Sequence, residues 1–158
     1  MNKSQIYLET SVISYLVSRP SGDIKVASHQ LATREWWERR ASSFELYISD
    51  IVLEEASEGD PEYSQKRLEA VSDITILGMT DEALNLAQML VKSVLPQKAY
   101  KDALHIAIAC LGGVDFVLTW NFKHIANASM SYDIIEICNE AGYDCPILCS
   151  PLQLLDIR

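Results

Sequence analysis

The sequence predicts an α/β domain in which helices cover both faces of a mostly parallel β-sheet. Short apolar runs of strand length alternate with longer segments that place apolar residues at helical spacing. The chain has 158 residues and is 49% hydrophobic, so it can bury a core without disulfides, and intrinsic disorder is not expected. We find no internal repeat, low-complexity stretch or second domain, and we expect residues 1–158 to form one domain.

The first strand is the apolar run IYL, which ends in Glu9, Thr10 and Ser11. Thr10 or Ser11 can cap the helix that follows, because a hydroxyl oxygen accepts a hydrogen bond from a free amide of the first turn. A second helix, capped by Asp23, is expected to run to about residue 40. Its candidate buried residues are Ile24, Ala27, Leu31 and Trp36.

The middle of the chain continues the alternation of strands and helices. Asp60 is a typical helix cap, and Thr80, Asp81 and Glu82 start a further helix. Ser49 and Asp50 are cap candidates for a short helix that carries Glu54 and Glu55. The expected strands are residues 44–48 and 74–77, and the expected helices are residues 51–57, residues 61–71 and a helix that starts at residue 80.

The segment KDALHIAIACLGGVDFVLTWNFKH, residues 101–124, joins a buried helix to a buried strand. Asp102 stands at the head of the helix, and two glycines end it because glycine accepts the left-handed conformation. The run FVL suits a strand buried on both faces, and the chain leaves it through the residues TWN. Ligands bind beyond the carboxyl ends of parallel strands, so we expect chemistry at this exit, with Asp102 facing it. A helix at residues 130–140 and a strand at residues 147–148 complete the chain.

The charge of the chain limits the kinds of partner that suit it. A formal net charge of −9 argues against a general nucleic-acid binder, which needs clustered Lys and Arg, but it allows a small basic rim or a basic protein partner. No apolar run reaches the roughly 20 residues that span a bilayer, and the N-terminal residues lack the architecture of a signal peptide. We therefore expect a cytoplasmic protein that does not enter a membrane.

The four cysteines are interpreted as reduced, structural thiols. Three of them lie close together in the sequence, at Cys138, Cys145 and Cys149, and only loosely resemble a zinc-binding cluster. No histidine follows to complete such a set.

Acidic side chains from distant parts of the chain are expected to meet at one edge of the sheet. They are Glu9, Asp102, and either Glu54 or Glu55, since consecutive helical residues diverge by about 100° and only one can point inward. Gathered carboxylates repel one another unless a cation neutralises them, and hard oxygen ligands suit Mg²⁺ or Mn²⁺. Such an ion can orient a water, lower its pKa and offset charge on a phosphodiester. Taken singly, Asp102 could instead cap its helix and Glu9 could merely end a strand.

Three stretches resemble, in order and spacing, the PIN-domain nucleases, and especially the VapC-like toxins of prokaryotic toxin–antitoxin pairs. They are IYLETSVISYL, LYISDIVLEEA, and DALHIAIA followed by FVLTWNFKHI, and together they span residues 5–125. The resemblance implies a three-layer α/β/α sandwich with a parallel sheet of about five strands. It also implies a metal-dependent endoribonuclease that cleaves RNA with Mg²⁺ or Mn²⁺, forms a homodimer and is inhibited by a small antitoxin protein.

Carried over residue by residue, the resemblance implies that Glu9, Glu55 and Asp102 bind the metal. Glu9 stands where the family usually has aspartate, and Glu55 fits the second acid because Ser49 precedes it by six positions, as the family's serine does. Asn121 stands where a fourth acid is often found, so it joins the catalytic set with a neutral oxygen. Three carboxylates would hold one divalent ion readily, whereas a second ion would depend on the substrate phosphate.

Other polar residues of these stretches are candidates for secondary roles at the site. His105 could support the metal site, although a lone histidine in an apolar helix is more often a hydrogen-bonded core residue. The candidates for supporting roles are Thr10, Ser11, Glu54, His105 and Thr119. The candidates for contact with substrate phosphate, as an alternative to plain surface solvation, are Lys101, Lys123 and His124.

The departures at Glu9 and Asn121 leave a second function open. It is a catalytically weak or inactive PIN-like module that binds RNA or protein. A phosphorylatable receiver domain is set aside, because the paired acids that it needs after its first strand are absent here.

Overall fold

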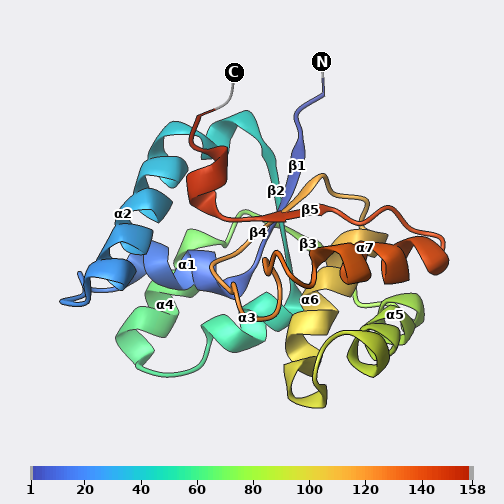
Figure 1. The fold of residues 1–158 in the computed structure, drawn as a ribbon. Helices are drawn as coiled ribbons and strands as arrows, with labels where there is room; N and C mark the ends of the chain where they lie inside the picture. Colours follow the sequence, from blue (N-terminus) through green and yellow to red (C-terminus); the bar gives the residue numbers. More distant parts are fainter. Residues whose placement is uncertain (1, 157–158) are drawn as a thin grey trace.

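The computed structural model describes residues 2–156, and a parallel five-stranded sheet lies at its centre (Figure 1). Residues 1, 157 and 158, which the predicted domain includes, lie outside the described range. The sheet has the order β3-β2-β1-β4-β5, and every neighbouring pair is parallel. The strands are β1 (Gln5–Leu8), β2 (Glu45–Ser49), β3 (Thr75–Leu77), β4 (Phe116–Leu118) and β5 (Ile147–Cys149).

The central strand β1 is buried on both faces. Ile6, Tyr7 and Leu8 are fully buried, as expected for an apolar run in a parallel sheet that is covered twice. Its register pairs Tyr7 with Tyr47 of β2 and with Val117 of β4. The carboxyl ends of these three strands therefore lie side by side at one edge of the sheet.

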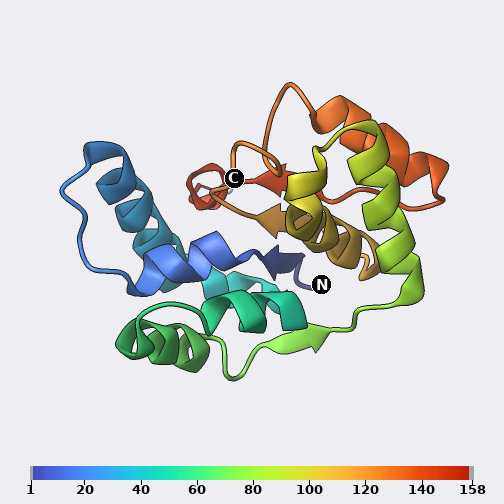
Figure 2. The same cartoon turned by 90° about the horizontal axis from the view of Figure 1, so that it is seen from below.

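Helices flank the sheet on two sides, so the fold is the predicted three-layer α/β/α sandwich (Figures 1 and 2). On one side α1 packs against α2, α3 and α4, and on the other α5 packs against α6 and α7. The first group is α1 (Thr10–Val17), α2 (Ile24–Arg39), α3 (Asp50–Ala56) and α4 (Pro61–Ala70). The second group is α5 (Asp81–Ser93), α6 (Tyr100–Leu111) and α7 (Ser131–Glu140).

The cap predicted at Thr10 or Ser11 is wrong, and the alternative in which Asp102 caps its helix is also contradicted. Neither Thr10 nor Ser11 caps α1, because Glu9 takes that position and accepts a hydrogen bond from the backbone N–H of Ser11. Asp102 does not cap α6, which begins at Tyr100, so Asp102 lies in the first turn and its side chain is free for another contact. The caps predicted at Asp23 and Asp60 are confirmed. Of the two candidates for α3, Ser49 is the cap and Asp50 is the first helical residue, and Thr80 caps α5.

The buried face of α2 contains polar as well as apolar residues, and two predicted core positions are wrong. Ile24 and Leu31 are 86% and 67% exposed, whereas Gln30 and Thr33 are buried. The Gln30 amide donates to Ser18 Oγ and to the Arg19 carbonyl, which satisfies it without water. The prediction is therefore wrong at Ile24 and Leu31, whereas Trp36 is buried as predicted.

Among residues 2–156 no helix combines the length and the apolarity needed to cross a bilayer. All four cysteines are free. In the described part of the chain, none of them belongs to a group with the spacing of metal ligands.

Gly113 ends the turn after α6 with a φ of +69°, a conformation that costs other residues energy. A Cβ added there meets no atom within 4 Å, so Gly113→Ala is expected to add backbone strain alone, about 1–2 kcal/mol of lost stability. Gly22 is the matched control, since its Cβ space is also open and its φ is not left-handed. Gly22→Ala should change stability by less than about 1 kcal/mol. Urea unfolding followed by circular dichroism compares them, and equal midpoints would contradict the strain argument.

Candidate metal and active site

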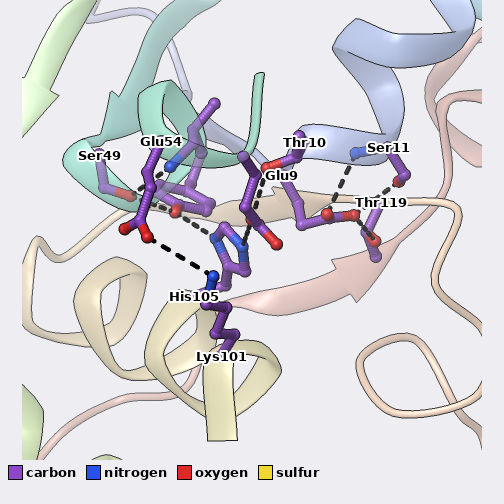
Figure 3. A network of polar contacts seen from close by, with 11 residues as sticks. Glu9, Thr10, Ser11, Ser49, Glu54, Lys101, His105 and Thr119 are labelled. Atoms are coloured by element: carbon purple, nitrogen blue, oxygen red, sulfur yellow. Dashed lines mark hydrogen bonds and ion pairs between the residues drawn. The ribbon is translucent and has the colours of Figure 1, made fainter. Parts of the chain in front are cut away.

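Polar side chains lie at the carboxyl ends of three neighbouring strands, at the same edge of the sheet. Glu9 follows β1, Ser49 ends β2, and Thr119 follows β4. The helix α3 starts directly after Ser49 and brings Glu55 to this edge. Figure 3 shows the labelled residues Glu9, Ser11 and Thr119 close together, with His105 from α6 approaching from the other side.

Glu9 is a buried carboxylate held by three donors. The Thr119 hydroxyl donates to Oε1 at 2.5 Å, and the Ser11 hydroxyl donates to the same oxygen at 2.6 Å. The backbone N–H of Ser11 donates to Oε2 at 3.1 Å. The Trp120 N–H in turn donates to the Ser11 hydroxyl at 2.8 Å, which ties α1 to the exit of β4. Donors to both oxygens fix the orientation of this carboxylate.

Glu55 points toward Glu9, whereas Glu54 points away from it. The side chain of Glu54 is 65% exposed, and its carboxylate lies 3.6 Å from Lys101 Nζ. Glu55 Oε1 accepts from the Thr10 hydroxyl at 2.8 Å and lies 2.6 Å from His105 Nε2. Burial raises the pKa of Glu55, but the hydrogen bonds from His105 and Thr10 and the nearby positive charge outweigh it, so its pKa lies below the usual value.

The two carboxylates fit a shared cation. Ligand atoms of Glu9, Glu55 and His105 all lie within 4.8 Å of one another. Oxygens on opposite sides of Mg²⁺ are roughly 4 Å apart, because each metal–oxygen distance is about 2.1 Å. The spacing and the oxygen ligands therefore suit Mg²⁺ or Mn²⁺.

Asp102 and Asn121 lie outside this group and are linked through His124. Asp102 Oδ2 lies 3.0 Å from His124 Nδ1, and the backbone N–H of His124 donates to Asn121 Oδ1 at 3.0 Å. The Asn121 N–H donates to the Thr119 hydroxyl, so this linked set adjoins the donors of Glu9. Two of the four predicted catalytic residues are thus brought together directly, and two are placed at the rim. Their roles stay predictions.

The candidate phosphate-binding residues have different surroundings. Lys123 is exposed, Lys101 faces Glu54, and His124 is engaged by Asp102. Trp120 and Trp36 are buried and Trp37 is half-buried. This favours packing over base stacking for the tryptophans.

Tyr7 belongs to the polar network of the site, although the sequence pattern predicts only a buried strand residue there. It reads as part of an apolar strand, yet its hydroxyl lies 2.7 Å from Ser49 Oγ and 2.6 Å from His105 Nδ1. Burial is the main reason that the pKa of Tyr7 lies well above its usual value, so the hydroxyl keeps its proton. The available signal was a tyrosine in a central strand, since a buried tyrosine hydroxyl needs a partner.

Comparison with solved structures identifies the fold. One similar chain belongs to the VapBC2 complex of Rickettsia felis, solved with a DNA fragment from its promoter, with a TM-score of 0.56, 19% identity, and coverage of 91% of this chain and 96% of that one. Another is Mycobacterium tuberculosis VapC20, described as a toxin that cleaves the sarcin–ricin loop, with a TM-score of 0.56, 16% identity, and coverage of 75% and 92%. No protein-family model and no curated protein matches the sequence. The predicted VapC-like, PIN-like resemblance is confirmed at the level of the fold.

Proposed function

We propose that this chain is a metal-dependent endoribonuclease and the toxin of a toxin–antitoxin pair. The observation that carries the proposal is the pair of carboxylates, Glu9 and Glu55, with ligand atoms within 4.8 Å, at the carboxyl edge of a parallel sheet in a VapC-like fold. Glu9, Glu55 and Asp102 would hold one Mg²⁺ or Mn²⁺. When bound, the ion supplies Lewis-acid chemistry: it lowers the pKa of a water and offsets negative charge on the phosphodiester.

The chain's own residues would orient the groups around that ion. Ser11 and Thr119 keep the Glu9 carboxylate turned toward the site, and Thr10 and His105 do so for Glu55. Asn121 Oδ1 already accepts from His124, so its Nδ2 remains to orient a water or a phosphate oxygen. Preorganisation of this kind lowers the barrier, because the groups need not reorient during the reaction.

The substrate would be held by a local basic rim, since the chain as a whole is strongly acidic. Lys101, Lys123 and His124 are the proposed phosphate contacts. Contacts through lysine release counterions, so RNA affinity should fall as salt concentration rises. An RNA target would place the protein in the cytoplasm.

The remaining partners follow from the same proposal. A small antitoxin could inhibit the site by placing a basic side chain, such as arginine, among the carboxylates. The comparison with a VapBC2 complex supports an antitoxin partner of this class. We also propose a homodimer, which light scattering of the purified protein would test.

RNA cleavage with controlled metal tests the function. A mixed pool of structured RNA is incubated with purified protein and Mg²⁺, Mn²⁺ or EDTA, beside Asp102→Asn and Glu9→Gln. We expect cleavage that requires metal and that falls in both variants by at least about 10²-fold, the size typical of losing one preorganised electrostatic group. Cleavage that persists in EDTA would contradict the proposal. Unchanged cleavage by Asp102→Asn would remove that residue from the site.

A binding module without catalysis is the second candidate function. Glu9 and Asn121 depart from the family's common acids, and Asp102 lies outside the group of close ligand atoms. Folded protein free of antitoxin that binds RNA or a partner protein but cleaves no RNA with either metal would favour this candidate.

A further inference from the structure

A buried chain of hydrogen bonds starts and ends on the same short helix. Ser49, the N-cap of α3, lies 2.7 Å from the Tyr7 hydroxyl, which lies 2.6 Å from His105 Nδ1. His105 Nε2 lies 2.6 Å from Glu55, one residue before the end of α3. Figure 3 labels Ser49 and His105 within this network, and Tyr7, Ser49 and His105 are all buried.

The proton positions along this chain follow from its two ends. A carboxylate only accepts hydrogen bonds, so His105 Nε2 must donate to Glu55. At the other end, Ser49 Oγ accepts the backbone N–H of Val52, which leaves the serine O–H to donate to Tyr7. Tyr7 then donates to His105 Nδ1, and every proton has an acceptor. The reverse direction would leave the Ser49 O–H without an acceptor among the described residues.

His105 Nε2 therefore carries a hydrogen and has no lone pair for a metal ion. Within residues 2–156, both hydrogen bonds to Glu55 fall on Oε1, from His105 and from Thr10, so Oε2 remains for the ion. We infer that His105 is a positioning residue, which Tyr7 and Ser49 lock in place so that it turns the Glu55 carboxylate toward the ion, and that it is not itself a metal ligand. The part of this inference that concerns the ion rests on the proposed function.

The state of the ring can be measured without metal or RNA. Nitrogen-15 NMR of the metal-free protein distinguishes the two neutral histidine tautomers and the doubly protonated ring. We expect His105 to carry its hydrogen on Nε2, with Nδ1 unprotonated. Tyr7→Phe should change the Nδ1 signal, because that variant removes the donor to Nδ1, whereas Tyr132→Phe, at an exposed tyrosine, should not. A hydrogen on Nδ1 in the wild type would overturn the proposed direction of the chain.

Mn²⁺ binding tests the positioning role. Calorimetry should show Mn²⁺ affinity lowered about 10- to 100-fold in His105→Ala and in Tyr7→Phe, the range typical of residues that orient a metal ligand. His105→Gln should recover most of the affinity, because the glutamine amide can donate to Glu55 from a similar position. Pulsed electron paramagnetic resonance of the wild type should show no directly bound nitrogen. A bound histidine nitrogen, or unchanged affinity in folded His105→Ala, would overturn the inference.

The two proposals fail in different ways. Wild-type protein that neither binds Mn²⁺ nor cleaves RNA would end the proposed function, and with it the claim that His105 positions a metal ligand. The NMR result would still decide whether the hydrogen bonds run from Ser49 through Tyr7 and His105 to Glu55.

Discussion

Replacing Glu55 with glutamine is expected to lower the rate of the proposed metal-dependent RNA cleavage by at least about 10²-fold. The variant removes a negative charge that lies within 4.8 Å of the nearest ligand atom of Glu9. The glutamine carbonyl oxygen can still accept from the Thr10 hydroxyl and the His105 N–H, which both bond Oε1, but an NH2 group then stands in place of Oε2, the oxygen proposed for the ion. Initial rates at saturating Mg²⁺ and at saturating Mn²⁺ separate lost chemistry from weakened metal binding.

The neighbouring glutamate provides a matched control. Glu54 has the same chemistry and lies on the same helix, but its side chain is 65% exposed and forms an ion pair with Lys101. An exposed ion pair contributes up to about 1 kcal/mol, so Glu54→Gln should retain nearly full activity and stability. A larger loss in Glu54→Gln than in Glu55→Gln would mean that Glu54 is the catalytic acid and that the local placement of α3 is wrong.

Truncation of Trp36 to alanine is expected to destabilise the protein by about 3–5 kcal/mol. The side chain of Trp36 is fully buried and stacks on Phe44, with ring centroids 6.0 Å apart. Its removal would leave a cavity between α2 and the start of β2 that the surrounding helices cannot fill by small shifts. Chemical unfolding monitored by far-ultraviolet circular dichroism measures the loss.

Two further variants separate cavity formation from loss of the indole N–H. Trp36 Nε1 has no hydrogen-bond partner among the described residues, so Trp36→Phe removes an unsatisfied donor, keeps an aromatic ring, and should cost much less than alanine. Trp37 is half-buried, and Trp37→Ala should also cost less. Equal losses at Trp36 and Trp37 would show that the α2 interface is not packed as described.

The fold could be predicted because the strands of a parallel sheet have a recognisable sequence pattern. Its strands are buried on both faces and therefore appear as short apolar runs, such as IYL and FVL, separated by capped helices. Boundaries shifted by a residue or two, as at β2, where residues 44–48 were expected and Glu45–Ser49 is observed. The buried positions at Ile24 and Leu31 of α2 were predicted wrongly because Gln30 and Thr33 are buried instead. Both form hydrogen bonds, and a hydrophobicity pattern does not show which polar side chains are buried with a partner.

The positions of the acidic residues in the fold were more predictable from the sequence than their contacts. The carboxylates could be placed at one edge because parallel strands end together. The preference for Glu55 over Glu54 rested on the family resemblance, in which a serine precedes the second acid by six positions. The direction of a side chain beyond its Cβ is not encoded in that pattern. The Tyr7–His105 contact and the pairing of Asp102 with His124 depend on which hydroxyl or ring nitrogen lies within about 3 Å, which only the packed structure determines.

The adjacency of β1 and β4 has a consequence for how the protein is made. Leu8 pairs with Leu118, and the Thr119 hydroxyl that holds Glu9 lies 110 residues further along the chain. A nascent chain that has emerged only through α5 lacks Thr119, His105 and Asp102. Its Glu9 carboxylate therefore lacks the hydrogen bond from Thr119. Long-range pairing of this kind also folds slowly. If the protein degrades RNA, most of the chain must therefore emerge from the ribosome before an active nuclease can form.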